Sequence, residues 1–388
     1  MPTGLSQRGA GVKQSPTFAI STKAKAMKAE GHDVIDFGLG QPADFEPPEN
    51  IKNAVQEALG KKGTGRYTPA PGLPVLRHTI AEKLQRDNGI KCNESNVMVT
   101  AGGKHALYNI MQVILDPGQE VIVPAPYWVS YPEMIGLAGG RQVTVETDDN
   151  FKFTAEAISE KISDKTKAII INSPNNPTGA MADESELRGI AELAVEKDIY
   201  IISDECYEPF VYGNRMLSPG SLGGDIAART FTVNTLSKTY AIPGWRIGYV
   251  AGPEREINAM IALQSHSTSN ISSVLQHAAV QALQGPQDSV ERMKEEFRKR
   301  RDFMVRELNN MGFRCPVPQG AFYVFPALPD GHEHAADSFR FVMELLDKQH
   351  VALVHGLGFG REGHVRISYA ASMHDIKQGM DRISRFVE

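Results

Sequence analysis

Short apolar runs alternate with segments of helical period through the middle of the chain. We predict strands at residues 96–100, 120–124, 167–172, 199–203, 229–234 and 246–251. We predict helices at residues 106–115, 184–197 and 257–283. Consecutive apolar, β-branched positions are typical of parallel strands that are buried on both faces. Their alternation with helices predicts a three-layer α/β domain with a mainly parallel sheet.

The pattern changes after about residue 285. Residues 289–308 are highly charged but keep apolar positions at helical spacing, which predicts a long surface helix, and a mixed tail of helices and strands follows. A chain of 388 residues is too long for one simple core. We predict a large domain of residues 47–288 and a smaller α+β domain that combines residues 1–46, including a helix at 21–30, with residues 289–388.

Composition excludes several classes of function. A net charge of -5 gives no basic field for nucleic acid. The apolar runs have the length of strands and are far too short to span a bilayer. The three cysteines are widely spaced, so the sequence predicts neither a disulfide framework nor a metal site. A reducing, cytoplasmic location fits this composition.

Lys238 and Arg246 carry the most informative chemistry. Lys238 follows an apolar predicted strand in mostly uncharged surroundings, where desolvation disfavours its ammonium form and favours a nucleophilic amine. Arg246 offers the planar cationic fork that suits a phosphate. Pyridoxal 5′-phosphate (PLP) is a cofactor that needs both an imine-forming amine and a phosphate anchor.

Four other strand ends also present suitable side chains, and ligands in open α/β sheets bind beyond the carboxyl ends of the strands. These ends carry Gly102, Gly103 and Lys104 at a helix start, Trp128 as a flat ring, Asn176 in a proline-rich loop, and Asp204 with Tyr207. Each feature has an ordinary structural explanation as a tight turn, core packing, a turn residue or a helix cap. Recurrence at five strand ends favours one shared ligand site.

Three segments resemble the class I and II aminotransferases of PLP fold type I. They are residues 127–134 (YWVSYPEM), 173–179 (SPNNPTG) and 244–249 (GWRIGY). The resemblance extends over essentially the whole chain and is greatest to the bacterial and plastid aspartate/prephenate branch. It implies a large three-layer PLP-binding domain, a smaller α+β domain and a homodimer with shared active sites.

The resemblance also implies roles for the cofactor residues. Lys238 would form the imine and move the proton, and Asp204 would pair with the protonated pyridine nitrogen. Tyr207 and Asn176 would hydrogen-bond the phenolic oxygen, while Trp128 would stack on the ring. The phosphate would be held by Gly102, Gly103, Lys104, Thr235, Arg246 and, from the partner subunit, Tyr67.

Substrate residues are implied in the same way. Arg366 would hold the α-carboxylate, helped by Gly40 and Asn176, and Trp128 would also contact the substrate. The apolar neighbours of Arg366 predict an amphipathic strand with Arg366 on the opposite face. Lys104 and Thr17 would bind the distal carboxylate of an acidic substrate. Two features leave the fine specificity open. Residues 40–45 (GQPADF) depart from the family's usual GEPDF pattern, and His105 suits either a helix surface or a substrate contact.

We therefore predict a PLP-dependent aminotransferase that moves the amino group of aspartate or glutamate to 2-oxoglutarate, oxaloacetate or prephenate by a ping-pong mechanism. The alternatives within this fold are an LL-diaminopimelate, alanine or aromatic aminotransferase and a PLP β-lyase. A PLP-fold regulator is disfavoured because the chain is acidic and has no room for a DNA-binding domain. A nicotinamide dehydrogenase is disfavoured because residues 101–103 lack the GxGxxG spacing.

Overall fold

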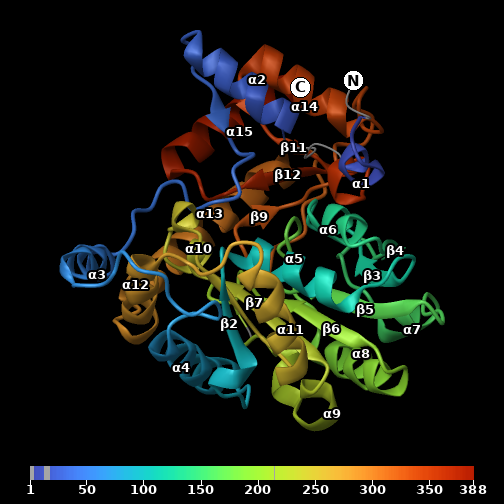
Figure 1. Cartoon of the computed structure of the whole chain (residues 1–388). Coiled ribbons are helices and arrows are strands. Elements are labelled where there is room, and N and C mark those ends of the chain that lie inside the picture. Colours follow the sequence, from blue (N-terminus) through green and yellow to red (C-terminus); the bar gives the residue numbers. More distant parts are fainter. Residues whose placement is uncertain (1–3, 13–17, 214) are drawn as a thin grey trace.

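A seven-stranded sheet forms the centre of the larger part of the molecule (Figure 1). The computed structural model describes residues 4–12, 18–213 and 215–388. The strand order is β2-β8-β7-β6-β5-β3-β4. The strands are β2 (Val97–Thr100), β3 (Glu120–Pro124), β4 (Arg141–Val145), β5 (Thr166–Asn172), β6 (Tyr200–Asp204), β7 (Thr230–Thr235) and β8 (Gly248–Ala251). Only β8 runs antiparallel to its two neighbours in this sheet, so the mainly parallel sheet is confirmed.

Helices cover both faces of this sheet and make three layers. Along β5, Ala168 and Ile170 pack against one set of helices, whereas Ile169 and Ile171 pack against the other set. The first layer contains α5 (Gly103–Ile114), α6 (Tyr131–Leu137) and α11 (Glu254–Ser265). The second contains α3 (Glu49–Gly60), α4 (Pro74–Lys83), α7 (Ala155–Ser159), α8 (Glu184–Glu196) and α12 (Ser273–Gln284). Short helices α9 (Gly224–Ala227) and α10 (Leu236–Thr239) lie beside β7 in the sequence.

Two predicted elements near β8 are corrected. The single helix predicted at 257–283 is wrong, because α11 ends at Ser265 and α12 begins at Ser273. The intervening polar residues favour turns over helix, and Ser269 has a positive φ of 60°. The strand predicted at 246–251 begins only at Gly248, since Arg246 has a left-handed backbone with φ 58°. Strand β4 was not predicted; its first residues are partly exposed and lack a continuous apolar run.

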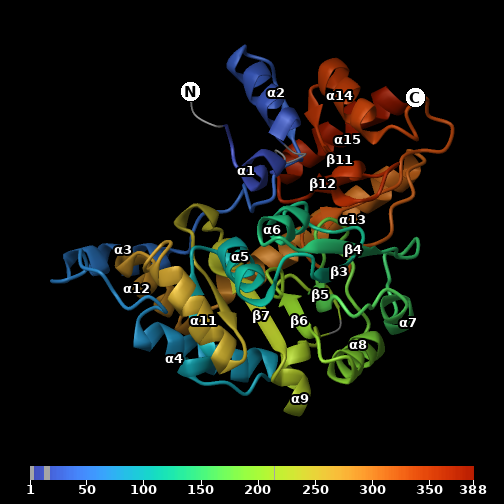
Figure 2. The ribbon, with the colours of Figure 1, turned by 45° about the vertical axis from the view of Figure 1, so that its right-hand side comes forward.

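The smaller part combines the two ends of the chain (Figure 2). It contains α1 (Gln7–Gly11), α2 (Phe18–Ala29), β1 (Ile35–Asp36), α13 (Asp288–Asn310), β9 (Tyr323–Val324), α14 (Ser338–Gln349), β10 (Val351–Ala352), β11 (Val354–His355), β12 (Val365–Ser368) and α15 (Met373–Val387). Parallel pairing of β1 with β10 ties the N-terminal segment to the C-terminal part. Ile20, Phe37, Phe297 and Phe322 share one buried cluster there. The boundaries at 46/47 and 288/289 stay a prediction.

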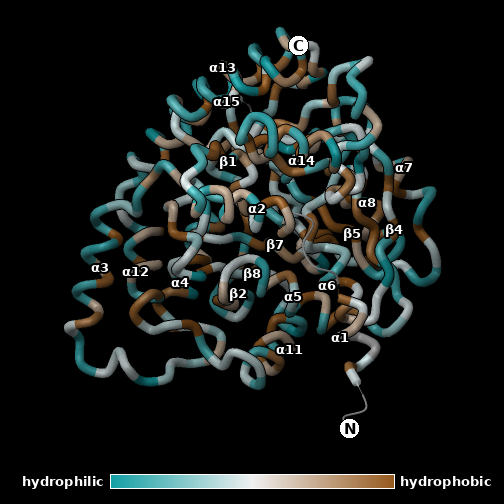
Figure 3. The backbone as a smooth tube through the Cα atoms, turned by 90° about the horizontal axis from the view of Figure 1, so that it is seen from above, coloured by the Kyte–Doolittle hydropathy of each residue, from teal (hydrophilic) through white to brown (hydrophobic). Residues whose placement is uncertain are grey.

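Hydrophobic residues gather around β5 and β7, whereas α13 presents polar residues along its outer side (Figure 3). Among the described residues, no helix has both the length and the apolar character needed to cross a bilayer. Cys92, Cys206 and Cys315 are free thiols.

Candidate active site

The carboxyl ends of the sheet strands meet the smaller part of the molecule at a cavity of about 430 Å³. This volume lies within the range typical of small-molecule sites. Most of the predicted site residues line it: Gly40, Gly103, Lys104, Trp128, Asn176, Asp204, Tyr207, Thr235, Lys238, Arg246 and Arg366. Two described residues do not line it: Gly102 lies against the guanidinium of Arg246, and Tyr67 is 91% exposed. Thr17, which was also predicted, falls outside the described residues.

An anion site is formed where α5 begins. Gly102 precedes the helix with φ 81°, and a Cβ at this position would lie 2.5 Å from Nη2 of Arg246. Only glycine therefore lets the guanidinium approach so closely. Nη1 of Arg246 donates to the Pro243 carbonyl and Nη2 to the Ala101 carbonyl, both at 3.0 Å. The fixed guanidinium and the helix N-terminus together suit a phosphate.

Asp204 ends β6 as a buried carboxylate. Its Oδ2 accepts a hydrogen bond from the Tyr131 hydroxyl (2.7 Å), and its Oδ1 accepts one from the Cys206 amide (3.3 Å). Burial raises the pKa of Asp204, although these hydrogen bonds oppose the rise. A carboxylate held this way among neutral donors suits a cationic partner such as a protonated ring nitrogen.

Lys238 presents a partly buried amine to the cavity from α10. Its Nζ donates to the Gly40 carbonyl at 2.6 Å, which joins the N-terminal segment to the large sheet. Burial, together with the charges of Arg246 and Arg366, lowers the pKa of Lys238 to about 8. A larger fraction of this amine is therefore unprotonated near neutral pH than for an exposed lysine, which favours attack on a carbonyl carbon.

Arg366 holds a second anion-binding fork inside the protein. Its Nη2 donates to the Gly38 carbonyl (2.7 Å) and its Nη1 to Oδ1 of Asn176 (3.1 Å). Its buried Nε has no hydrogen-bond partner among the described residues. The amphipathic strand predicted here is wrong, because Val365 and Ile367 are as buried as Arg366 itself. The arginine is enclosed by both parts of the molecule, which suits a desolvated carboxylate.

Trp128 and Lys104 form one wall of the cavity. Nζ of Lys104 lies 4.9 Å from the centre of the Trp128 ring, a cation–π contact. The Trp128 ring in turn meets Tyr131 edge to face at 5.5 Å. Partial burial and the charge of Arg246 lower the pKa of Lys104. Lys104 thus adds a cation to the cavity besides Lys238 and the two arginines, Arg246 and Arg366.

A family model described as aminotransferase class I and II matches residues 32–383. The chain belongs to the class I and II aminotransferases. A protein of Aquifex aeolicus, named a probable aspartate/prephenate aminotransferase, is 45% identical over 394 residues, with 100% of both chains covered. Aspartate aminotransferase of Bacillus subtilis is 45% identical over 390 residues, with 99% of both covered. The structure of aspartate aminotransferase from Thermus thermophilus with maleate has a TM-score of 0.93 at 41% identity, covering 98% of this chain and 99% of that one.

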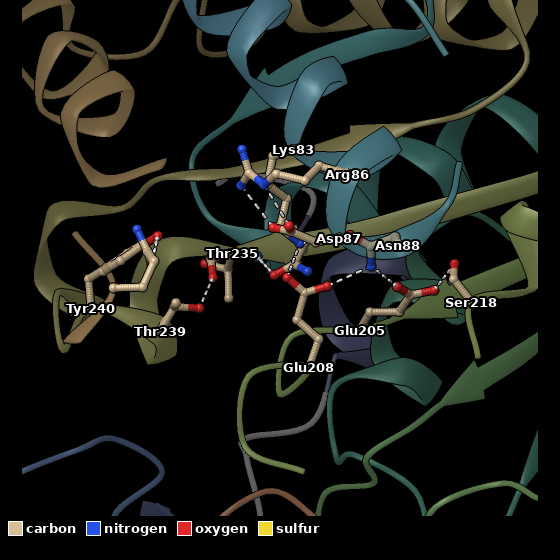
Figure 4. Close-up of polar contacts among 12 residues, drawn as sticks. Lys83, Arg86, Asp87, Asn88, Glu205, Glu208, Ser218, Thr235, Thr239 and Tyr240 are labelled. Carbon is tan, nitrogen blue, oxygen red and sulfur yellow. Dashed lines mark hydrogen bonds and ion pairs between the residues drawn. The ribbon is translucent and has the colours of Figure 1, made fainter. Parts of the chain in front are cut away.

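Behind the cavity of this aminotransferase lies a polar network (Figure 4). The Asn88 amide lies between two carboxylates and donates to Glu205 (3.1 Å) and to Glu208 (2.7 Å). Lys83 forms an ion pair with Glu208, and the Ser218 hydroxyl donates to Glu205 at 2.6 Å. Burial and the charge of Glu208 raise the pKa of Glu205 to about 7. These contacts hold Glu205 and Glu208 of the segment 204–208, whose other residues Asp204, Cys206 and Tyr207 line the cavity.

Two tyrosines of the aminotransferase cavity were not assigned a role from the sequence. Tyr131 bonds to Asp204, and it lies inside the segment 127–134 that carries the family resemblance, so a signal for it existed. Tyr323 comes from β9, more than a hundred residues beyond Tyr207, and its hydroxyl lies 3.0 Å from the Tyr207 hydroxyl. No local pattern could reveal that second contact. His105 accepts a hydrogen bond from the Ala101 amide at 3.3 Å and does not line the cavity.

Proposed function

We propose that this aminotransferase uses PLP and transfers the amino group of aspartate or glutamate to a 2-oxo acid in two half-reactions. The observation that carries the proposal is the convergence of an amine, a carboxylate and two arginines in one cavity: Lys238, Asp204, Arg246 and Arg366. These are the groups needed to hold an aldehyde, a pyridine nitrogen, a phosphate and a substrate carboxylate.

The residues present fit PLP. Arg246 and the start of α5 would hold the phosphate, and Asp204 would hold the ring nitrogen in its protonated form. Tyr207 and Asn176, which are hydrogen-bonded to each other at 3.3 Å, would face the phenolic oxygen. Bound PLP supplies an aldehyde that condenses with amines and a ring that withdraws electrons.

The protein's own part in the reaction is binding, orientation and proton movement. Arg366 would fix the substrate α-carboxylate and so orient the Cα–H bond. Nζ of Lys238 would take that proton and return it, as a general base and then a general acid. Burial of the site excludes water, which strengthens each of these electrostatic contacts.

An acidic substrate is favoured by Lys104, a cation of the cavity that is needed neither for the phosphate fork of Arg246 nor for the α-carboxylate site at Arg366. An amino acid with two carboxylates can engage Arg366 with one and Lys104 with the other. The relatives named aspartate/prephenate and aspartate aminotransferases, and the Thermus structure with the dicarboxylate maleate, support the same class. The amino acceptor would be a matching oxo acid, namely 2-oxoglutarate, oxaloacetate or prephenate.

Replacing Lys104 with alanine tests the substrate class. We expect kcat/KM for aspartate and glutamate to fall by about 10–100-fold, since a hydrogen bond to a charged group contributes about 1.5–3 kcal/mol. Single-turnover absorbance of the PLP-loaded protein, mixed in turn with aspartate, glutamate, alanine and phenylalanine, measures the effect. Lys167 is a matched control, because its Nζ also lies over a ring, that of Tyr200, but outside the cavity. Equal losses of kcat/KM for all four amino acids would show that Lys104 does not bind the distal carboxylate.

We also propose a homodimer in which Tyr67 reaches the phosphate in the partner's cavity. Its side chain is 91% exposed in a single subunit, so it is accessible to a partner subunit. Replacing Tyr67 with phenylalanine should raise the Kd for PLP by about tenfold or more, the value of one hydrogen bond to a charged group. Equilibrium titration of the apoprotein with PLP measures it, and sedimentation establishes the oligomer. An unchanged Kd in a dimeric protein would remove Tyr67 from the site.

A cytoplasmic location completes the proposal. It rests on the cysteines, which are free in the structure and too widely spaced for a disulfide framework. Fractionation of cells that express the chain would test it.

A further inference from the structure

Tyr323 connects the two halves of the active site through its hydroxyl group. It lies on β9, where it pairs with Ser368 of the strand that carries Arg366. Its side chain is fully buried, and its hydroxyl lies 3.0 Å from that of Tyr207. Its ring lies 4.7 Å from the Arg366 guanidinium carbon. The ring and the hydroxyl thus serve different neighbours, so the two contributions can be separated by experiment.

The direction of the hydrogen bonds around Tyr207 follows from its neighbours. Nη1 of Arg366 can only donate, so the atom of Asn176 that it meets is the amide oxygen. The other amide atom, Nδ2 of Asn176, therefore faces the Tyr207 hydroxyl and donates to it at 3.3 Å. A tyrosine oxygen can accept further hydrogen bonds but has a single proton to donate. The direction of that proton depends on Tyr323.

We propose that Tyr323 is a positioning residue, which donates to the Tyr207 oxygen and so directs the Tyr207 proton into the cavity, toward the phenolic oxygen of PLP. This inference rests on the proposed use of PLP. Among the described residues, Tyr207 is the only hydrogen-bond partner of the Tyr323 hydroxyl. Burial raises the pKa of both tyrosines, so both keep their protons at neutral pH. With Asn176 and Tyr323 both donating to its oxygen, Tyr207 has its own proton left for the cavity.

The test is a pH titration of the absorbance of bound PLP in the absence of substrate. A hydrogen bond donated to the phenolic oxygen stabilises the anionic form of that oxygen. Loss of the bond therefore moves the midpoint of the pH-dependent change in PLP absorbance to higher pH. We expect Tyr323→Phe to raise the midpoint by about 0.3–1 pH unit, the scale of a neutral hydrogen bond acting through one intermediate. Tyr207→Phe should raise it further. The double variant should match Tyr207→Phe alone, because Tyr323 acts through Tyr207.

The control is Tyr369→Phe. The Tyr369 hydroxyl is also fully buried in the smaller part of the molecule, but it donates to the Ala321 carbonyl at 3.2 Å and does not line the cavity. Loss of the Tyr369 hydroxyl should leave the midpoint of the PLP absorbance titration unchanged, even if it lowers the Tm. Since phenylalanine keeps the Tyr323 ring, the contact with Arg366 survives and KM for the amino acid should change less than kcat.

The outcomes separate the two proposals. Wild-type protein that binds no PLP would overturn the proposed function and this inference with it. Wild-type protein that binds PLP, with an unchanged midpoint in Tyr323→Phe, would overturn only the positioning role. A double variant whose shift equals the sum of the single shifts would also overturn it, because the two tyrosines would then act independently.

Discussion

Replacing Lys238 with alanine should abolish amino transfer, lowering kcat/KM by about 10⁴-fold or more, because the variant loses both the amine that binds the aldehyde and the general base. Mass spectrometry after borohydride reduction gives a second measure. The wild-type chain should retain the mass of the cofactor on Lys238, and the variant should not. A variant that still turns over, or that retains the reduced cofactor at another lysine, would contradict the assignment.

Lys238 should also make the stability of the protein without PLP depend on pH. The pKa of Lys238 is lowered to about 8 from its ordinary value of 10.5, mainly by burial. The unfolded chain therefore binds more protons than the folded one between these values, and stability rises with pH across that window. Lys238→Met, which keeps most of the volume, should be more stable than wild type below about pH 8. The difference should disappear above about pH 10.5, as urea unfolding at several pH values would show.

Local sequence patterns predicted the strands whose burial can be inferred from a few consecutive residues. The apolar β-branched runs at β3, β5, β6 and β7 are strands because they are buried on both faces, and that pattern is visible along the chain. Lys238 could be found because its amine follows such a strand in uncharged surroundings. The positions that ligands reach in this fold are strand ends, so chemistry at several strand ends predicted one cavity.

Contacts between distant segments were beyond local patterns. The antiparallel direction of β8 depends on how the chain returns after α10, and nothing within residues 248–251 encodes it. Tyr323 reaches Tyr207 only because β9 and β12 place it beside Arg366. The apolar neighbours of Arg366 predicted an amphipathic strand with Arg366 on the opposite face. Its burial depends on the other end of the chain, where the Gly38 carbonyl accepts its hydrogen bond.

The burial of Arg366 leads to the second large effect. Lysine at this position keeps the positive charge but loses the planar fork, so we expect kcat/KM for aspartate to fall by about 10–100-fold, the value of one hydrogen bond to a charged group. Leucine at this position should lower kcat/KM for aspartate by about 10³-fold or more, because it also leaves Oδ1 of Asn176 and the Gly38 carbonyl without their hydrogen-bond donor. Steady-state kinetics measures both variants, with the Kd for PLP as an independent readout.

A matched control separates substrate binding from general damage to the fold. Arg301 on α13 is also buried, and its guanidinium carbon lies 4.7 Å from the Tyr212 ring centre, the same separation that Arg366 has from Tyr323. Arg301→Lys should lower the Tm without changing KM for aspartate, since Arg301 does not line the cavity. Arg366→Lys should raise KM strongly at a nearly unchanged Kd for PLP. If both variants changed KM alike, Arg366 would act by supporting the smaller part of the molecule, and the carboxylate would bind elsewhere.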